Sequence, residues 1–210
     1  MSIYFSNFPK DLYSFNDFYE IYVTNIVSRI SFEQKFMNNA AAYYVHRIKD
    51  GETPEGLAYK IYGNSERHWI ILLMNEIIDP LYDWPLNYES FNKYIISKYN
   101  SIEYAMSNMH SYYKVTTSTI NQNSPSRITN VEKIRVDFST YTDILENPND
   151  YTYQVITLAD GNSLSRQVSA QAKSFYDYET EQNEAKRSIK ILKQEFVSSA
   201  VSELKKVFEK

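Results

Sequence analysis

The stretch from Tyr43 to Leu86 constrains the fold of this chain more than any other part. It holds three of the four glycines and both tryptophans of the 210 residues. Glycine and proline mark where regular elements end, and tryptophan needs a large buried or interfacial surface. We therefore expect this stretch to form a small folding unit of its own.

The first half of this unit is predicted to be a strand, a turn and a capped helix. Residues 43–49 alternate as a short strand does, and Asp50-Gly51 then turns the chain. Thr53 is a suitable N-cap, because Pro54 follows at the first helical position, where its missing N–H costs nothing. Gly63 is expected to end this helix.

A second helix is predicted to begin at Asn64 or Ser65. It is apolar almost all round, so it must be buried. Its apolar run of about ten residues is too short to cross a bilayer. Two dipeptides, Asp79-Pro80 and Trp84-Pro85, close the unit, since the residue before a proline is pushed away from the helical region.

We expect the apolar side chains of these elements to share one core. Its predicted members are Val45, Leu57, Ala58, Ile61, Trp69, Leu73 and Ile77.

The order of strand, Asp-Gly turn, capped helix, Tyr-Gly break and second helix resembles the LysM module. The residues at matching places are Val45, Gly51, Glu52, Thr53, Leu57, Ala58, Tyr62, Gly63, Leu73 and Asn75. The resemblance implies a βααβ fold and, as one function, binding of N-acetylglucosamine polymers. After Asn75 the chain departs from the LysM pattern, because DPLYDWPLN replaces the usual glycine turn and closing strand.

A larger resemblance spans DGETPEGLAYKIYG, HWIILLMNEIIDP and YDWPL, with SNFPK near the start and NEAKRSIKIL near the end. Together these segments look like the baseplate wedge subunit of contractile-tailed bacteriophages that carries a LysM-like domain. That family implies a structural virion protein with no enzymatic step. It also implies six copies per baseplate, joining adjacent wedges into a sixfold ring after assembly in the host cytoplasm. The implied partners are the other wedge subunits and the neighbouring wedges.

The chain as a whole is predicted to be α+β, with a LysM-like βααβ module embedded in a mixed helix and strand chain with extended arms. Residues 1–42 would form an aromatic arm followed by a helix or strand, and residues 43–95 the LysM-like domain. Residues 96–210 would form a C-terminal α+β region. Apolar spacing predicts a helix over residues 90–109, with a break near Asn100-Ser101.

The C-terminal region is predicted to contain strands between about residues 112 and 158. Residues 112–120 and 128–138 alternate and are rich in Thr and Val, and residues 151–158 resemble them. Residues 163–186 have modest helical character, followed by a short strand at Ile189 and Ile191. Residues 194–208 predict a terminal amphipathic helix.

Aromatic residues make up 16% of the chain, including 20 tyrosines and 11 phenylalanines. Such a bias suits extensive interfaces, although AT-rich codon usage produces the same composition. The N-terminal aromatics either pack on another subunit or fold back on their own core, and Trp84 either anchors an interface or caps the LysM-like core. The candidate interface residues are Phe5, Phe8, Tyr82, Trp84, Tyr176 and Tyr178.

Composition and motifs argue against several other functions. The net charge is −4 with mixed signs and no basic stripe, which disfavours nucleic acid as a partner. There is no cysteine, the histidines match no metal-binding spacing, and no nucleotide or serine-hydrolase motif is present, so we expect neither cofactor nor metal nor catalytic site. The absence of a long apolar run argues against a membrane partner.

Carboxylate pairs such as Glu76 with Asp79, or Asp79 with Asp83, are better explained as turn and cap residues than as a glycosidase pair. The leading hypothesis is therefore a structural baseplate wedge subunit. The alternative is a LysM-type module that binds peptidoglycan or chitin oligomers, and an enzyme ranks third.

Overall fold

The structure is a computed structural model, and it describes residues 5, 8–16, 19–27, 31–32, 37–121, 127–157 and 163–208. Helices and strands are mixed along the chain, which confirms the α+β class. Its contacts divide into two compact units, residues 1–91 with 183–210, and residues 92–182. The boundary falls within two helices, α5 (Tyr88–Tyr99) and α9 (Phe175–Ala185).

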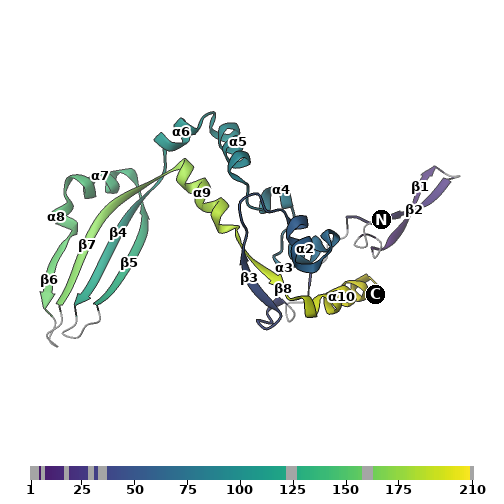
Figure 1. The fold of residues 1–210 in the computed structure, drawn as a ribbon. Helices are drawn as coiled ribbons and strands as arrows, with labels where there is room; N and C mark the ends of the chain where they lie inside the picture. Colours follow the sequence, from purple (N-terminus) through teal and green to yellow (C-terminus); the bar gives the residue numbers. More distant parts are fainter. Residues whose placement is uncertain are drawn as a thin grey trace. The chain divides into compact units, whose positions relative to one another are not determined.

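The first unit begins with a two-stranded hairpin that the sequence did not predict (Figure 1). Strand β1 (Lys10–Asn16) pairs antiparallel with β2 (Tyr19–Thr24), and Leu12 lies opposite Tyr22. The sequence left helix and strand open for the second of these segments, and the structure has a strand. The two segments form strands because they pair with each other, although their sequences lack the alternation that predicts a strand.

The predicted strand and two helices follow at the expected places. They are β3 (Tyr43–Arg47), α2 (Pro54–Tyr62), η2 (Ser65–Arg67) and α3 (His68–Met74). The Thr53 hydroxyl accepts a hydrogen bond from Gly56 N at 3.1 Å. Gly63 ends α2 in the left-handed region with φ 69°. The capping chemistry read from the sequence is therefore confirmed.

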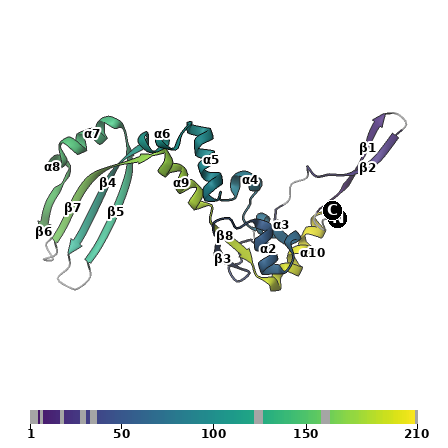
Figure 2. The same ribbon diagram turned by 45° about the horizontal axis from the view of Figure 1, so that its top comes forward.

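The partner of β3 comes from the far end of the chain. Strand β8 (Ser188–Leu192) pairs antiparallel with β3, and the two lie side by side in both ribbon views (Figures 1 and 2). The predicted short strand and terminal helix are thus present, the latter as η3 (Gln194–Phe196) and α10 (Val197–Phe208).

Most of the predicted core of this unit is buried. Leu57, Ala58 and Trp69 lie in the core, and Ile61, Leu73 and Ile77 pack against it partly buried. Val45 was wrongly expected there, since 67% of its surface is exposed. Val45 lies opposite Lys190 in the sheet. Ile189 and Ile191 of β8 are buried on the other face, because successive side chains of a strand point to opposite faces. The core-facing side of the sheet is therefore the side of Ile189 and Ile191, and Val45 points away from it.

The second unit contains the predicted broken helix. Helix α5 ends at Tyr99 and α6 (Ile102–Ser107) begins three residues later. Between them Asn100 has φ 68°, and the Ser101 hydroxyl accepts a hydrogen bond from Tyr104 N at 3.0 Å. Asparagine tolerates the left-handed region better than most residues, which explains the break.

A four-stranded antiparallel sheet follows, with strand order β5-β4-β7-β6. The strands are β4 (Met109–Asn121), β5 (Arg127–Val136), β6 (Tyr153–Thr157) and β7 (Ser163–Ser174). The sequence predicted the β4–β5 hairpin and β6. It did not predict α7 (Phe138–Glu146) and α8 (Pro148–Tyr151), which lie along the sheet and pack against β7.

The prediction of helical character for residues 163–186 was wrong in its first half. Residues 163–174 form β7, which pairs with β4 on one side and β6 on the other. Its sequence, SLSRQVSAQAKS, has few β-branched residues. An inner position between two strands outweighs this weak local preference.

Candidate assembly interfaces

A short turn after α3 carries three large apolar side chains into solvent. Ile78, Leu81 and Tyr82 are 68%, 79% and 73% exposed. We refer to these three residues as the apolar knob. Leu81 and Tyr82 lie in α4 (Pro80–Asp83), a single helical turn with Asp79 as its N-cap. Ile78 lies just before that N-cap.

Two aspartates hold the backbone of the knob. The Asp79 carboxylate caps α4 by accepting a hydrogen bond from Leu81 N at 3.0 Å. The Asp83 carboxylate accepts from Asp79 N at 3.1 Å and from Ile78 N at 3.3 Å. This placement supports the interpretation of these carboxylates as turn and cap residues.

The core anchors the knob through Trp84. Only 7% of Trp84 is exposed, and its indole N–H donates to the Glu52 carbonyl at 2.8 Å. Of the two alternatives for Trp84, an interface anchor or a cap of the core, the structure therefore favours the cap. An indole that finds a hydrogen-bond partner is readily buried.

The chain on either side of Trp84 is also tied down. The Lys186 ammonium donates to the Tyr82 carbonyl. Beyond Trp84, the Asn183 amide accepts from Leu86 N at 2.7 Å and donates to Leu86 O at 3.0 Å. The backbone of the knob is therefore held by several hydrogen bonds while its side chains are exposed, which lowers the backbone entropy lost when a partner binds it.

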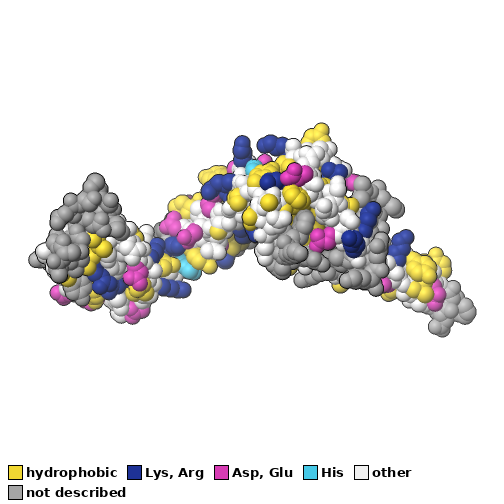
Figure 3. Space-filling view, turned by 90° about the horizontal axis from the view of Figure 1, so that it is seen from below, with side chains coloured by type: hydrophobic (Ala, Val, Ile, Leu, Met, Phe, Trp, Pro, Cys, Tyr) yellow, Lys and Arg dark blue, Asp and Glu magenta, His cyan; other side chains and the backbone are white. Residues whose placement is uncertain are grey.

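The β1–β2 hairpin is a second surface rich in exposed apolar residues. Leu12 and Tyr13 of β1 are each 53% exposed, and Tyr19 and Tyr22 of β2 are 61% and 73% exposed. Figure 3 shows hydrophobic side chains gathered on this hairpin. A two-stranded hairpin with both faces wet is only marginally stable in water. We therefore expect it to gain stability from a binding partner.

The N-terminal candidates Phe5 and Phe8 differ in their exposure to solvent. Their rings lie 5.4 Å apart, but Phe5 is 47% exposed and Phe8 only 5%. Phe8 is thus buried in its own unit, whereas nearly half of the Phe5 surface is exposed. The rest of residues 1–7 lies outside the described residues.

The candidates Tyr176 and Tyr178 lie in the second unit, on α9, and both are half-buried. The Tyr178 ring stacks on His110 with 3.8 Å between ring centroids. One face of the Tyr178 ring is therefore already covered within the unit. The predicted interface residues thus fall into three pairs on different elements, Phe5 with Phe8, Tyr82 with Trp84, and Tyr176 with Tyr178.

One buried carboxylate organises the junction of α5 and α9 within the second unit. Glu179 is 6% exposed and accepts hydrogen bonds from Lys98 at 2.8 Å, Tyr99 at 2.7 Å and Tyr94 at 3.0 Å. Burial by itself raises the pKa of Glu179, but these three donors outweigh it and leave the pKa below its ordinary value. Burial and the bond to Glu179 raise the pKa of Tyr99 to about 12.

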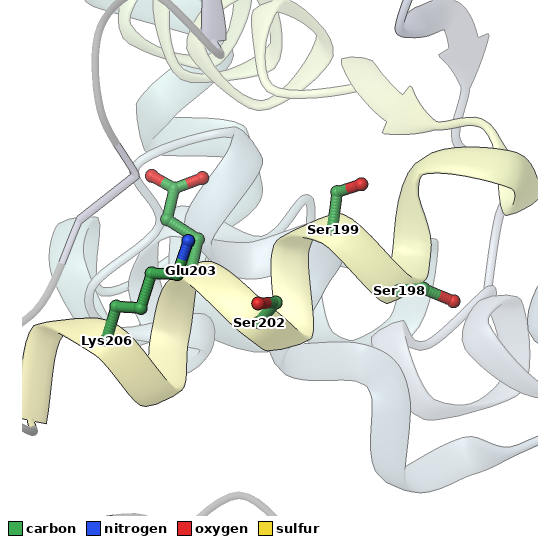
Figure 4. A pocket seen from close by; sticks show the side chains of 5 residues that line it. All are labelled: Ser198, Ser199, Ser202, Glu203 and Lys206. Atoms are coloured by element: carbon green, nitrogen blue, oxygen red, sulfur yellow. The ribbon is translucent and has the colours of Figure 1, made fainter.

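The described residues include a pocket on α10 but no cluster suited to a metal ion. A pocket on α10 is lined by Ser198, Ser199, Ser202, Glu203 and Lys206, all from one helix (Figure 4). It offers no aromatic platform for a sugar. No three carboxylate or histidine side chains converge on a metal position in the described ranges. None of the helices seen there is long and apolar enough to span a bilayer.

Comparison with known proteins decides the family. The family described as "Base plate wedge protein 53" matches residues 13–207, which is most of the chain. The chain belongs to this family. It is therefore a baseplate wedge subunit, a structural component of the phage tail in the virion.

A relative of this wedge subunit is "Baseplate wedge protein gp53" of Enterobacteria phage T4. The two are 32% identical over 74 residues, which is 34% of this chain and 38% of the relative. The match to that curated relative thus spans well under half of either protein.

The wedge subunit has exposed residues that the sequence reading missed. Ile78 was wrongly predicted to belong to the buried second helix, which ends at Met74, and Leu81 was predicted only as part of the closing turn. The available signal was their position beside Asp79-Pro80 and Asp83, because aspartate and proline favour turns, and turns run over the protein surface. The bonds that make this turn rigid come from Glu52, Asn183 and Lys186, which no local pattern connects to it.

Proposed function

We propose that this subunit joins adjacent wedges into the sixfold baseplate ring of a contractile tail, with the apolar knob as a principal contact. The observation that carries this proposal is the knob itself. Three large apolar side chains are held in solvent by capped turns and a buried tryptophan anchor. Clustered apolar exposure of this kind marks protein interaction sites, and rigid anchors contribute most of the binding free energy.

We further propose that β3, α2, α3 and β8 form a LysM-like module. Two antiparallel strands enclose two helices in the order βααβ, and the residues matching the LysM pattern lie in it. Asn75, the last of those residues, bonds Lys190 of β8 through both ends of its amide. In this arrangement the closing strand comes from residues 188–192 rather than from the segment after Asn75.

The proposed partners are other wedge subunits and the neighbouring wedges, with six copies per baseplate assembled in the host cytoplasm. No catalytic step, nucleic acid or membrane is part of the proposal. The contacts must hold while wedges rearrange during sheath contraction, and several small contacts suit that requirement better than one large rigid one.

The alternative, carbohydrate binding by the LysM-like module, requires free polar groups near Gly51–Pro54 and Ile77–Leu81. In the structure the Glu52 carboxylate accepts from Lys49 N at 3.2 Å and lies 2.9 Å from His46 Nε2. The second stretch exposes Ile78 and Leu81 instead of polar groups. These contacts favour the assembly function.

Analytical ultracentrifugation of the full chain with the other wedge proteins of the same phage tests the proposal. We expect the wild-type chain to drive wedges into a ring. Tyr82→Asp should weaken ring formation by at least about 30-fold, as expected for loss of about 2 kcal/mol at an interface anchor. Tyr59→Asp is the matched control, because Tyr59 is a 67% exposed tyrosine of the same unit outside the knob.

If both variants lost ring formation equally, or if neither lost it, the knob would not be part of the interface. If the wild-type chain formed no ring and instead bound insoluble peptidoglycan or chitin oligomers in a pull-down, the carbohydrate alternative would replace the assembly function.

A further inference from the structure

The β3–β8 sheet has one sealed edge and one open edge. On the outer side of β8, the Asn75 amide donates to Lys190 O and accepts from Lys190 N, both at 2.7 Å. The Tyr62 hydroxyl donates to Leu192 O at 2.9 Å on the same side. The sheet can therefore gain a strand only at β3.

The register shows which backbone groups of β3 face the open edge. Residues opposite each other in an antiparallel pair either bond each other or both face outward. Lys190 faces outward and lies opposite Val45, so the N–H and C=O of Val45 also face outward. By alternation the same holds for Tyr43 and Arg47. Within the described part of the chain none of these groups has a hydrogen-bond partner.

The outer edge of β2 follows from the same reasoning. Asn25 N donates to Pro9 O at 2.8 Å, which makes this a bonded pair of the hairpin. Alternation along the β1–β2 register then turns Glu20, Tyr22 and Thr24 outward. These residues offer the spacing of donors and acceptors that the β3 edge requires.

We infer that β2 of one copy adds antiparallel to the open edge of β3 in a second copy. This inference rests on the proposed joining of wedges and names the contact between copies. A single register places all three outward residues of each strand opposite each other: Tyr22 with Val45, Glu20 with Arg47, and Thr24 with Tyr43. The result is a four-stranded sheet, and three or more strands are what an independently stable sheet needs.

Charge selects β2 over β1 as the added strand. In the register above, Glu20 lies opposite Arg47, which pairs with Glu184 at 3.0 Å within its own chain but keeps 75% of its side chain exposed. The equivalent pairing with β1, with Leu12 opposite Val45, would place Lys10 opposite Arg47. Opposite charges stabilise a cross-strand pair, whereas like charges destabilise it. On the other face of the added strand, Val23 would pack on Tyr44.

The connection from β2 to β3 argues for a second copy as the source of the strand. Phe32 and Met37, on that connection, are 4% and 6% exposed and lie in the core of the unit. Phe32 packs against Trp69 of α3. With the connection anchored there, β2 pairs only with β1 among the described strands of its own chain.

A contact between different surfaces of identical copies also suits a ring. Such heterologous contacts close into rings when the rotation allows it. One added strand of five or six residues gives a small interface, which is weak alone. Six such contacts within a ring reinforce one another through effective concentration.

Cysteine cross-linking tests the register, because the chain has no cysteine of its own. Full-length Val23→Cys and Tyr44→Cys variants are mixed with the other wedge proteins and oxidised. These two positions would be a non-bonded pair with Cα atoms about 4.5 Å apart, a distance compatible with a disulfide. We expect a mixed disulfide dimer by mass spectrometry. The control is Leu12→Cys with Tyr44→Cys, one strand further away, which should yield at least tenfold less.

A second variant tests the open edge of β3 without removing any hydrogen bond between β3 and β8. Val45→Pro removes an outward N–H, and proline is tolerated on edge strands at such positions. It should leave unfolding by urea little changed and abolish the Val23–Tyr44 cross-link.

Rings that form without this cross-link overturn the inference and leave the proposed function standing. An internal disulfide in the double variant Val23→Cys/Tyr44→Cys, with no mixed dimer, shows that β2 adds to its own β3 and also overturns the inference. If the wild-type chain forms no ring, the proposed function fails and this contact fails with it.

Discussion

At the scale of single residues, Glu179 stands out because its carboxylate is buried. A buried carboxylate is tolerated only when charge and hydrogen bonds compensate its lost hydration. Lys98, Tyr99 and Tyr94 supply this compensation, and the bond to Lys98 is also an ion pair at 2.8 Å. The network ties α5 to α9 inside the second unit.

Glu179→Gln is expected to destabilise the second unit by about 1–3 kcal/mol, the usual range for hydrogen bonds to a charged group. Urea unfolding measures this change. Glu181→Gln, on the same helix but with a 61% exposed side chain, is the control and should change the urea midpoint far less than Glu179→Gln does. Equal effects of the two substitutions would contradict the role assigned to burial.

The unfolding free energy should also depend on pH through the ionisation of Glu179. The pKa of Glu179 lies below its ordinary value of 4.5 in the folded chain. Its contribution is therefore full above pH 4.5 and is lost as the pH falls through the lowered value. We expect the difference in unfolding free energy between wild type and Glu179→Gln to shrink below that pH. A difference that grew on acidification would refute this assignment.

At the scale of elements, a single side chain takes the place of a strand. Asn75 bonds both backbone groups of Lys190 and also donates to Ile71 O at 2.8 Å. It thereby ties the C-terminal end of α3 to β8 and leaves β3 as the free edge. An unprotected edge strand is a risk for unwanted pairing, which evolved proteins block or use.

Asn75→Ala should therefore lower the unfolding free energy by about 2–3 kcal/mol, because it leaves two backbone groups of β8 without partners. Asn147→Ala is the comparison, since the Asn147 amide bonds only the exposed Asp143 side chain. That change should stay within about 0.5 kcal/mol. Similar urea midpoints for the two variants would show that Asn75 does not hold β8.

At the scale of the whole molecule, each of the two units has its own buried side chains. Ile70 is fully buried in the first and Ile144 is 1% exposed in the second. Truncating either to alanine leaves a cavity that costs about 2–5 kcal/mol.

We expect calorimetry of the full chain to show two transitions, because separate cores need not unfold together. Ile70→Ala should lower one midpoint and Ile144→Ala the other. A single transition that both substitutions shift equally would mean that the chain unfolds as one cooperative unit.

The sequence by itself determined the features that depend on neighbouring residues. Thr53, Pro54 and Gly63 set the limits of α2, and Asn100-Ser101 set the break after α5. Capping and turn chemistry act over three or four residues, so a local pattern contains the whole cause. The β4–β5 hairpin was predictable for the same reason.

Only the tertiary structure decided the features that depend on distant partners. The pairing of β3 with β8, the strand conformation of residues 163–174 and the burial of Trp84 all rest on contacts between segments far apart in the chain. Those contacts, rather than intrinsic propensity, determine whether a strand forms and which of its faces is buried. The exposed knob and the open edge of β3 follow from what these contacts leave uncovered, which is why the sequence predicted a structural assembly subunit but neither of these two surfaces.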